Sequence, residues 1–577
     1  MPQDLQKWGI SKNISSILRS MTFKKSCNSS LPFVGYLCTY QARLCVRHLK
    51  TNQILPVAAS QKSLRALPQE TLFLIKDRTI LSVLGHISDP AVDEKIILAS
   101  LPHRTFAPDV MRECASFEGL SDSILSMYPQ RIDLSHLCFC TIDPIDAKDF
   151  DDAICYNATT GELFVAIADV SEFVAPFSAL DKAARMRAFS LYLPHKCLPM
   201  LPSILSEELC SLKPHKKRLA FVWKFRLHRG HAKVLRTECM LAIIESKARL
   251  HYDEVDAILQ RGTPKTDIES MLLALFAQTS RLRKRRLKTG YDFRISENRL
   301  LLDSAQNLLE VRTATPSMAH SLVEEAMLLA NLASAEMLAQ HSQTALYRTH
   351  RSPTMGKLRQ LFAELYAFGY DTGTLTKSQI HARIAAIQKQ ANRRKQRGEI
   401  DKIIIKSFAQ ARYAPTASEH FGLGFSLYTH FTSPIRRYID LCVHRLLKAM
   451  LVGKKAGQVV QNLDEICEIC NTKERELACA VCDFCDRIYA RAAQKLLGST
   501  VEATIIIPAE SNLPAILRAD SLLVGARLFA QHCELPLLTK VHVRIENVNL
   551  IRARIVCKIL GEAKQEDRKG ARRARNV

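Results

Sequence analysis

Five aspartates lie within ten residues of this chain, in the segment Asp143-Pro144-Ile145-Asp146-Ala147-Lys148-Asp149-Phe150-Asp151-Asp152. Strand-like runs precede and follow this segment, which predicts a loop or bend between two strands. Asp149 and Asp151 would share one face of an extended segment, and a bend after them would direct a third carboxylate toward the same point. Carboxylates this close repel one another, and a hard divalent cation offsets that repulsion best. The fold must therefore leave the cluster accessible to a cation.

The rest of the chain is basic. It has 577 residues, with 81 Lys and Arg against 57 Asp and Glu, which gives a formal net charge of +24. Such a charge favours a polyanionic partner, nucleic acid before an anionic membrane surface. Mg²⁺ takes oxygen ligands and keeps water or substrate phosphate in its shell, so an acidic cluster in a basic chain indicates phosphodiester chemistry. A solvated acidic turn or a structural Ca²⁺ loop is the alternative, although the spacing lacks the central Gly and terminal Glu of an EF-hand.

A second segment suited to phosphate is Tyr428-Thr429-His430-Phe431-Thr432-Ser433-Pro434-Ile435-Arg436-Arg437-Tyr438-Ile439-Asp440-Leu441. Two adjacent arginines that follow a Ser-Pro turn can present a guanidinium group to phosphate through two hydrogen bonds. Arg437 or Arg445 could instead form an ordinary structural ion pair with Asp440. Both interpretations stay open at this point.

Strand-like segments at both ends of the chain enclose a long central part. Short β-rich runs between residues 33 and 84 predict a small β module, and several runs between 499 and 560 predict a five-stranded oligonucleotide-binding (OB) barrel. The central part begins with strand-like runs and shows helical spacing from about Ser317. The pattern therefore predicts a multidomain α+β protein, in which a central α/β domain is flanked by small β-barrel modules.

The acidic segment and the second segment together resemble the signatures of the ribonuclease II / ribonuclease R (RNB) family of processive 3′→5′ exoribonucleases. Intermediate stretches resemble the family as well, in the expected order: Val165–Val170, Tyr192–Pro194 with Pro199–Pro202, Leu209–Leu212, Ile243–Tyr252, Val323–Met327 and Tyr347–His350. The resemblance covers roughly residues 81–490 and implies a central RNB catalytic domain.

With this resemblance, the chain divides into six expected parts. They are a flexible N-terminal segment (1–30), a cold-shock or OB-like β module (31–90), a connector (91–130), the RNB catalytic domain with C-terminal helices (131–497), an S1-like OB barrel (498–561) and a basic disordered tail (562–577).

The resemblance also implies the site residues, by their positions within the motifs. The expected metal ligands are Asp143, Asp149, Asp151 and Asp152, and Asp146 is an extra residue expected in a solvated turn.

Three further positions of the site follow from the same resemblance, and Arg437 is added as a phosphate-binding candidate. Arg436 matches the catalytic arginine, and Tyr192 matches an aromatic residue that stacks on a base near the RNA 3′ end, although a buried core tyrosine is the alternative. Glu325, or its neighbour Glu324, matches the acidic residue that contacts the terminal nucleotide. Arg437 is the remaining candidate for RNA binding.

The expected reaction is hydrolysis of single-stranded RNA from a free 3′ end, with release of nucleoside 5′-monophosphates. Two Mg²⁺ ions, for which Mn²⁺ could substitute, would lie about 3.5–4 Å apart and activate water. Asp143 and Asp152 are the first choices as direct ligands, and Asp151 is expected to orient the water. Arg436 would neutralise charge on the scissile phosphate. The protein is expected to act as a monomer.

Two other functions compete with this prediction. One is a catalytically silent RNA-binding member of the same family, against which the intact carboxylates and Arg436 argue. The other is a nucleic-acid-binding scaffold built on the terminal barrels, which would work without a metal.

Basic runs lie at residues 281–288 and 393–397, and each could line an RNA path or form a solvated helix face, with the solvated face favoured for the second run. Five cysteines between Cys467 and Cys485 have metal-like spacing, but their segment is typical of one continuous helix, which favours a packing stripe over a metal site.

No apolar run reaches the about 18 residues of a membrane span, and the N-terminus lacks a secretory signal. We therefore expect a cytoplasmic protein with reduced thiols, and organellar import guided by residues 7–25 is the less favoured alternative.

Overall fold

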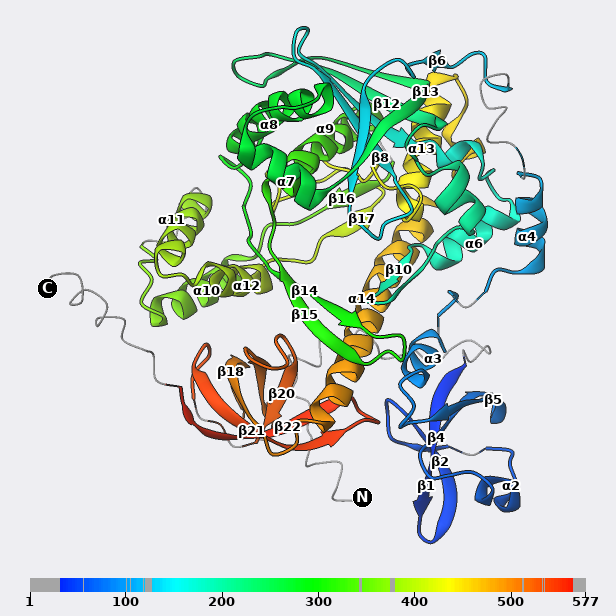
Figure 1. The fold of residues 1–577 in the computed structure, drawn as a ribbon, viewed down its shortest axis with the longest axis vertical. Coiled ribbons are helices and arrows are strands. Elements are labelled where there is room, and N and C mark those ends of the chain that lie inside the picture. Colours follow the sequence, from blue (N-terminus) through cyan, green and yellow to red (C-terminus); the bar gives the residue numbers. More distant parts are fainter. Residues whose placement is uncertain are drawn as a thin grey trace, which may run out of the picture.

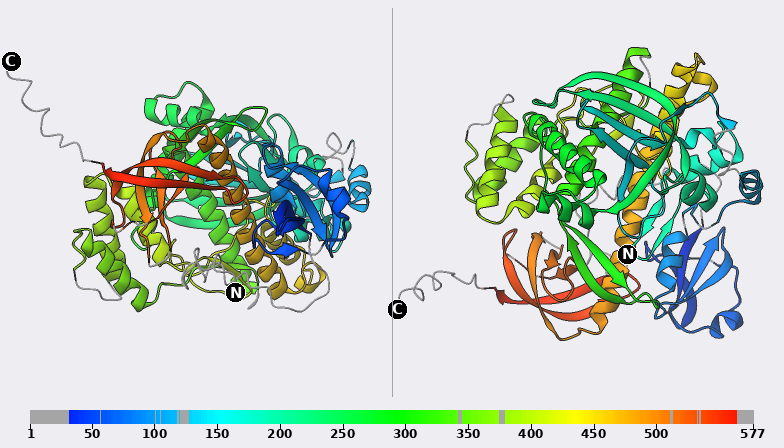
Figure 2. Two further views of the ribbon diagram at one scale, coloured as in Figure 1. Left: turned by 90° about the horizontal axis from the view of Figure 1, so that it is seen from below. Right: turned by 45° about the horizontal axis from the view of Figure 1, so that its top comes forward.

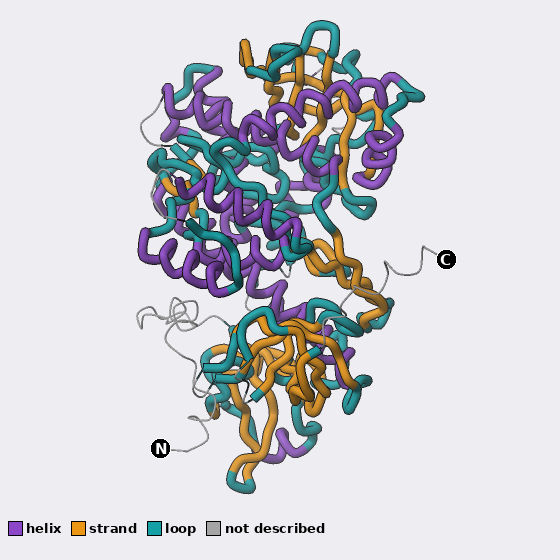
Figure 3. The backbone as a smooth tube through the Cα atoms, turned by 90° about the vertical axis from the view of Figure 1, so that its left-hand side faces the viewer, coloured by secondary structure: helices purple, strands orange, loops and turns teal. Residues whose placement is uncertain are grey.

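The structure is a computed structural model that describes residues 32–563, except 56, 100, 104, 118, 120–126, 342–344, 374–378, 511–512, 532 and 534. The expected N-terminal segment and nearly all of the expected basic tail lie outside the described residues. A large α/β domain occupies one end of the molecule, and two β modules lie side by side at the other end (Figure 1). Figure 3 shows the same division from the side.

The N-terminal module is a five-stranded sheet with the strand order β3-β2-β1-β4-β5. Its strands are β1 (Phe33–Tyr40), β2 (Arg43–His48), β3 (Ile54–Leu55), β4 (Thr71–Lys76) and β5 (Thr79–His86), and the short helix α2 (Gln61–Arg65) follows β3. The next helix, α3 (Val92–Leu98), packs Val92 and Ile96 against Leu72 and Leu84 of this sheet. A segment expected within the connector is therefore attached to the module.

The central domain contains a six-stranded sheet with the order β12-β9-β8-β7-β13-β6. Its strands are β6 (Ile132–Asp133), β7 (Phe139–Asp143), β8 (Asp152–Asn157), β9 (Glu162–Ala168), β12 (Lys217–Leu227) and β13 (Val234–His251). The strands are rich in Val, Ile and Phe and are almost entirely buried between β7 and β12, as expected for a sheet covered by helices.

The helices of this domain are α4 (Pro108–Ala115), α6 (Ala179–Arg187), α7 (Tyr252–Arg261), α8 (Asp267–Arg286), α9 (Met318–His341) and α13 (Tyr438–Leu451). The prediction that helices begin near Ser317 was wrong, because α7 and α8 precede that residue. The basic run at the end of α8 hides its periodicity, since Arg283 to Arg286 form its last turn.

Four smaller parts complete the central domain. The helices α10 (Met355–Ala367), α11 (Ile380–Arg393) and α12 (Arg397–Ser407) share their own hydrophobic core. The pairs β14 (Glu297–Leu302) with β15 (Leu308–Ala314), β16 (Tyr347–Thr349) with β17 (Arg412–Ala414), and β10 (Leu191–Leu193) with β11 (Lys196–Leu198) are two-stranded. The last of these, which we call the β10–β11 hairpin, carries Tyr192.

A 32-residue helix, α14 (Leu463–Gln494), runs from the central domain to the two β modules (Figure 2). It is followed by a closed barrel with the order β18-β19-β20-β22-β21, which confirms the predicted five-stranded OB barrel. The barrel strands are β18 (Thr500–Ile507), β19 (Ala515–Ala519), β20 (Arg527–Ala530), β21 (Lys540–Asn549) and β22 (Arg554–Glu562). Phe484 and Ile488 of α14 belong to the same core as the barrel interior. Among the described residues, no helix is long and apolar enough to cross a membrane.

Candidate active site

The aspartate cluster lies at one end of two adjacent strands. Asp143 is the last residue of β7 and Asp152 is the first residue of β8, and the two strands pair in antiparallel fashion. The intervening loop holds Asp149 and Asp151, as expected, and Asp146 is exposed. The predicted loop between two strands is therefore present. The five aspartates lie in this loop or at the strand ends that border it, and Asp146 is the exposed one.

Asp151 joins the two segments that the sequence singled out. Its Oδ1 accepts a hydrogen bond of 2.8 Å from the backbone N–H of Ile435, and its Oδ2 lies 3.4 Å from Nε of Arg436. The side chain of Asp151 is 3% exposed, and Oδ2 is buried without a hydrogen bond. The single arginine thus faces a carboxylate that keeps an unused acceptor.

Asp149 is held from another direction. The hydroxyl group of Tyr192 donates a hydrogen bond of 2.6 Å to Asp149 Oδ2. Tyr192 is 43% exposed, so the alternative of a buried core tyrosine does not hold. An exposed aromatic side chain is a surface on which a nucleic-acid base can stack.

Burial and mutual repulsion make these carboxylates hard to ionise. Burial, together with the charge of Asp152, raises the pKa of Asp143 to about 8. Burial also raises the pKa of Asp152 to about 6 and that of Asp151 well above its usual range, although Arg436 lowers both in part. One guanidinium group therefore compensates the cluster only incompletely, and a further positive charge would stabilise the ionised form.

The cluster fits a hard cation by its chemistry. All of its donors are oxygens, one of them is buried without a hydrogen bond, and the repulsion between them is unbalanced. Within the described residues, no three carboxylate, imidazole or thiol groups already converge on one point. Asp149 is engaged with Tyr192 and Asp151 with Ile435 and Arg436, so ion binding requires local rearrangement of these side chains.

The neighbouring arginines have structural partners. Arg437 Nη2 donates a hydrogen bond of 2.8 Å to Oδ1 of Asp440. This is the structural ion pair that the sequence left open as the alternative to phosphate binding. Arg445 does not pair with Asp440. It binds Oδ1 of Asp181 at 2.7 Å and is fully enclosed. Arg436 is thus the member of the pair that faces the carboxylates, while the role of Arg437 in RNA binding stays a prediction.

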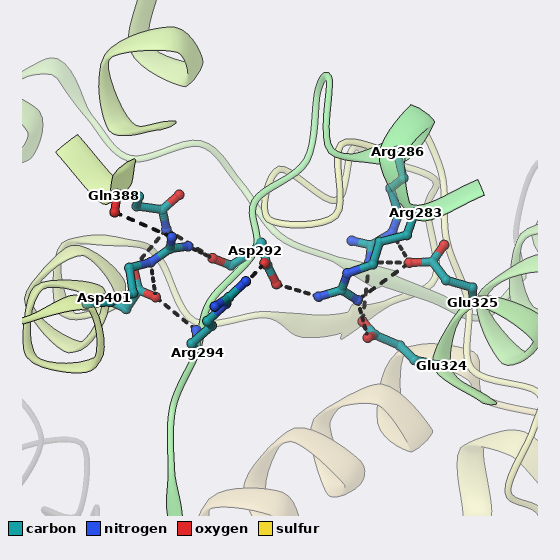
Figure 4. A network of polar contacts seen from close by, with 9 residues as sticks. Arg283, Arg286, Asp292, Arg294, Glu324, Glu325, Gln388 and Asp401 are labelled. Atoms are coloured by element: carbon teal, nitrogen blue, oxygen red, sulfur yellow. Dashed lines mark hydrogen bonds and ion pairs between the residues drawn. The ribbon is translucent and has the colours of Figure 1, made fainter. Parts of the chain in front are cut away.

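The two glutamates of α9 face the last turn of α8 (Figure 4). Arg286 donates from Nε and Nη2 to Oε1 of Glu325, at 3.0 and 2.5 Å, and Arg283 donates to Oε2 of Glu324 at 2.9 Å. Glu325 is buried, and burial raises its pKa despite the contact with Arg286. Arg286 thus already orients the carboxylate of Glu325. The contact of Glu325 with RNA stays a prediction.

In the basic run of α8, Arg283 and Arg286 are neither a free surface for RNA nor part of a solvated face, because both bind carboxylates. Arg283 also binds Asp292 Oδ1 at 2.5 Å, and the backbone carbonyl of Asp292 accepts hydrogen bonds from Gln388 and Arg397. The network of Figure 4 therefore connects α8 and α9 with α11 and α12. It fixes the segment between α8 and β14 to the central domain.

The cysteine series lies on α14, and the predicted continuous helix is confirmed. Cys467 and Cys470 are buried, whereas Cys479 and Cys482 are exposed. They thus point to different surroundings along the helix.

Sequence reasoning gave no role to Tyr252, the first residue of α7. Its ring stacks on that of His320, with the centroids 3.8 Å apart and the planes 7° apart. Burial and the charges of Asp152 and Asp143 raise its pKa, so the phenol lies beside the cluster. Tyr252 directly follows β13, whose residue His251 pairs with Asp143, and this adjacency was the signal that could have found it.

The backbone beside Arg436 is held by residues 188–190. The N–H of Ser190 donates to the carbonyl of Arg436 at 3.0 Å, and the N–H of Tyr438 donates to the carbonyl of Ala188 at 2.8 Å. Ala188 has a φ of 61°, a conformation that glycine adopts more easily. This strained turn directly precedes the β10–β11 hairpin, so the arginine segment and Tyr192 are built on one backbone pairing.

Comparison with known proteins agrees with this geometry. The RNB domain matches residues 131–453, and the second OB domain of ribonuclease R matches residues 34–98. The chain belongs to the RNB family, whose members include exoribonucleases of the hydrolase class. This confirms the resemblance that the two motifs predicted.

The curated relatives to which this chain is similar include proteins named ribonuclease R. Ribonuclease R of Helicobacter pylori (strain ATCC 700392 / 26695) is 37% identical over 491 residues, which cover 83% of this chain and 75% of the relative. Ribonuclease R of Vibrio cholerae is 32% identical over 454 residues, which cover 74% of this chain and 54% of the relative.

Solved structures share the fold. The apo form of Mycoplasma genitalium RNase R superposes with a TM-score of 0.82 at 23% identity, covering 92% of this chain and 90% of that chain. The yeast protein Ssd1, described as a pseudonuclease, superposes with a TM-score of 0.68 at 19% identity, covering 91% of this chain and 67% of that chain. The fold by itself therefore does not decide whether a member is catalytic.

Proposed function

We propose that this protein is a processive 3′→5′ exoribonuclease that hydrolyses single-stranded RNA to nucleoside 5′-monophosphates. The observation that carries the proposal is the meeting of the two motif segments, where Arg436 lies 3.4 Å from Asp151 inside an undercompensated cluster of four aspartates. Family membership and the curated ribonuclease R relatives support the 3′→5′ exoribonuclease activity.

Asp143, Asp149, Asp151 and Asp152 would hold two Mg²⁺ ions, or Mn²⁺ in their place, and these ions would supply water activation and charge stabilisation when bound. Asp151 is positioned by the Ile435 N–H, which fixes one oxygen and leaves the other available. Arg436 remains half exposed at its side chain, so its guanidinium group can also reach the scissile phosphate.

The RNA end would be held by groups around the cluster. The exposed ring of Tyr192 would stack on a base, which suits sequence-independent digestion because every base offers a π-face. Glu325 would contact the terminal nucleotide through Oε2, which has no hydrogen bond among the described residues, while Arg286 holds Oε1. Arg437 would contribute through its charge near Asp152.

Single-stranded RNA with a free 3′ end is the proposed substrate, and the +24 charge supplies affinity without sequence preference. Solved structures of M. genitalium RNase R are described as complexes with ribose-methylated single-stranded RNA and with double-stranded RNA, and that protein is similar in fold to this one. Action as a cytoplasmic monomer is part of the same proposal.

The test uses a 3′-tailed duplex and a single-stranded RNA, each uniformly labelled at its backbone phosphates, with Mg²⁺ or with EDTA. We expect mononucleotide release by the wild type in Mg²⁺, none in EDTA, and none by Asp151→Asn, whose RNA affinity should be retained. RNA binding without any degradation in Mg²⁺ would establish the catalytically silent alternative. An activity that EDTA leaves unchanged would favour the metal-independent scaffold.

A further inference from the structure

The β10–β11 hairpin is too small to hold its own shape. It has three residue pairs, Leu191 with Leu198, Tyr192 with Cys197 and Leu193 with Lys196, and its turn consists of Pro194 and His195. Isolated two-stranded hairpins are marginally stable in water, so contacts from outside fix this one: its three leucines are buried in the core that α14 shares with the barrel, and its turn has contacts of its own. Because Tyr192 reaches Asp149 from its first strand, the placement of the hairpin sets the placement of Tyr192.

The turn is held by the N-terminal module. Oε2 of Glu94, on α3, lies 2.9 Å from Nε2 of His195, and Oε1 of Glu94 accepts a hydrogen bond of 2.9 Å from Nζ of Lys196. Burial raises the pKa of Glu94, but the contacts with His195 and Lys196 outweigh this and leave it below its usual value. Both carboxylate oxygens are thus used on the tip of the hairpin.

The same turn packs against α14. The ring of His195 stacks on that of Phe484, with centroids 5.2 Å apart and planes 24° apart. Phe484 is fully buried and belongs to the core shared with the barrel. His195 therefore contacts α3 through its nitrogen and α14 through its face.

The helix that carries Glu94 is itself fixed to α14 by the preceding residue. Both oxygens of Asp93 bind the guanidinium group of Arg491, which also donates to the backbone carbonyls of Ile87, Ser88 and Asp89. Asp93 is buried. Two consecutive acidic residues of α3 thus have different partners: Asp93 anchors the module, and Glu94 extends from that anchor to the hairpin.

We propose that Glu94 is a positioning residue, through which the N-terminal module holds the tip of the β10–β11 hairpin and thereby sets Tyr192 against Asp149. The proposal rests on the proposed function, because it assigns a catalytic consequence to the place of Tyr192. It makes the N-terminal module a part of the active-site scaffold as well as a surface for RNA. A module that only bound RNA would not need a contact with the turn of this hairpin.

Glu94→Gln is the test variant, because the amide keeps the size of the side chain and removes its charge. We expect kcat to fall about three- to tenfold, the effect of one weakened hydrogen bond to a charged group, while the affinity for RNA in EDTA stays the same. Glu310→Gln is the matched control, since Glu310 forms an exposed ion pair with Arg312 at 3.0 Å on the β14–β15 ribbon. It should leave both values unchanged.

A double-mutant cycle with Tyr192→Phe identifies the route. Removing the Tyr192 hydroxyl breaks its bond to Asp149, so Glu94→Gln should add little further loss of kcat in that background. Independent, multiplicative losses in the double variant would overturn the proposal, and so would a Glu94→Gln enzyme with weakened RNA affinity and unchanged kcat.

A second variant guards against misfolding. If Glu94→Gln unfolds at assay temperature, His195→Gln keeps the anchor between Asp93 and Arg491 and should show the same loss of kcat without loss of RNA affinity. A His195→Gln enzyme with wild-type kcat would contradict the positioning role. A wild-type protein that never degrades RNA would instead refute the proposed function, so the two failures are distinct.

Discussion

Asp151, just before β8, and Asp169, just after β9, are both buried aspartates, with 3% and 0% exposure, but their surroundings are opposite. Asp169 lies 2.5 Å from Arg131 and 2.8 Å from Lys448, and it accepts a hydrogen bond from Ser171. Burial alone would raise its pKa, yet Lys448 and Arg131 outweigh burial and hold the pKa far below the usual range. Asp151 has one cation at 3.4 Å and a pKa well above its usual range.

The difference separates a charge that the fold compensates from one that it leaves uncompensated at the proposed active site. The cations around Asp169 balance its negative charge, so its ionised form stabilises the fold and no further cation is required. The structure compensates Asp151 and its neighbours incompletely, and ionisable groups whose pKa values are perturbed in this way are typical of functional sites. Each of the following predictions tests one side of this comparison.

The largest expected effect is on stability. Asp169→Asn leaves Arg131 and Lys448 with Glu172 as their remaining shared carboxylate, and we expect a loss of about 3 kcal/mol in the free energy of unfolding, the lower end of the range for a broken buried ion pair. Asp151→Asn removes an undercompensated charge and should be neutral or stabilising. Urea unfolding of both variants, at neutral pH and without divalent ions, measures the difference. Equal destabilisation of the two variants would remove the basis of the comparison.

Substitutions of Arg436 and Arg131 should also have different effects, the first on catalysis and the second on stability. Arg436→Gln should lower kcat about 10²–10³-fold, the usual effect of losing a preorganised charge at a reacting group, with little change in stability. Arg131→Gln should weaken folding, while the folded fraction keeps its kcat. Single-turnover degradation of RNA, normalised to the folded fraction by circular dichroism, separates these outcomes, and a fully active Arg436→Gln enzyme would contradict the assignment.

Divalent ions should stabilise only the undercompensated region. At an Mg²⁺ concentration 100 times the dissociation constant, the free energy of unfolding should rise by about 2.7 kcal/mol in the wild type. Asp151→Asn should lose most of this increase, and Asp169→Asn should keep it. Thermal unfolding against Mg²⁺ concentration provides the measurement, with Ca²⁺ as a check on ion preference. An identical rise in all three proteins would place the bound ion elsewhere.

The smallest expected effect is that of acid on stability, which we expect to act mainly through Asp169. Because the folded pKa of Asp169 is lowered, its contribution to stability is complete above the unfolded pKa of about 3.9 and is lost as the pH falls toward the folded value. The urea midpoint of the wild type should therefore decrease more steeply than that of Asp169→Asn below about pH 4. Parallel curves for the two proteins would show that Asp169 is not the group responsible.

Sequence patterns predicted those parts of the fold and site that depend on local spacing. The β7–β8 loop, the closed C-terminal barrel and the uninterrupted helix α14 follow from periodicity and strand-forming residues. The encounter of Asp151 with Arg436 was implied by the family resemblance rather than by spacing.

Other contacts could not be predicted, because they join residues far apart that no period relates. The partner of Arg445 proved to be Asp181, 264 positions away, although nearby Asp440 was the open candidate. The pairing of Glu325 with Arg286 depends on how α8 packs against α9, and the attachment of α3 to α14 joins Asp93 to a residue 398 positions later. Such contacts are set by tertiary packing alone.

The helix α14 limits the insertions and deletions that this protein can accept during evolution. Asn471 binds the backbone of Tyr413 near the arginine segment, Phe484 stacks on the hairpin tip, and Arg491 holds the N-terminal module, all along one unbroken helix. Inserting one residue between Asn471 and Phe484 would rotate every later side chain by about 100°. The length of α14 is therefore under a constraint of helical phase, and insertions or deletions should be tolerated in the loops around it but excluded from this span.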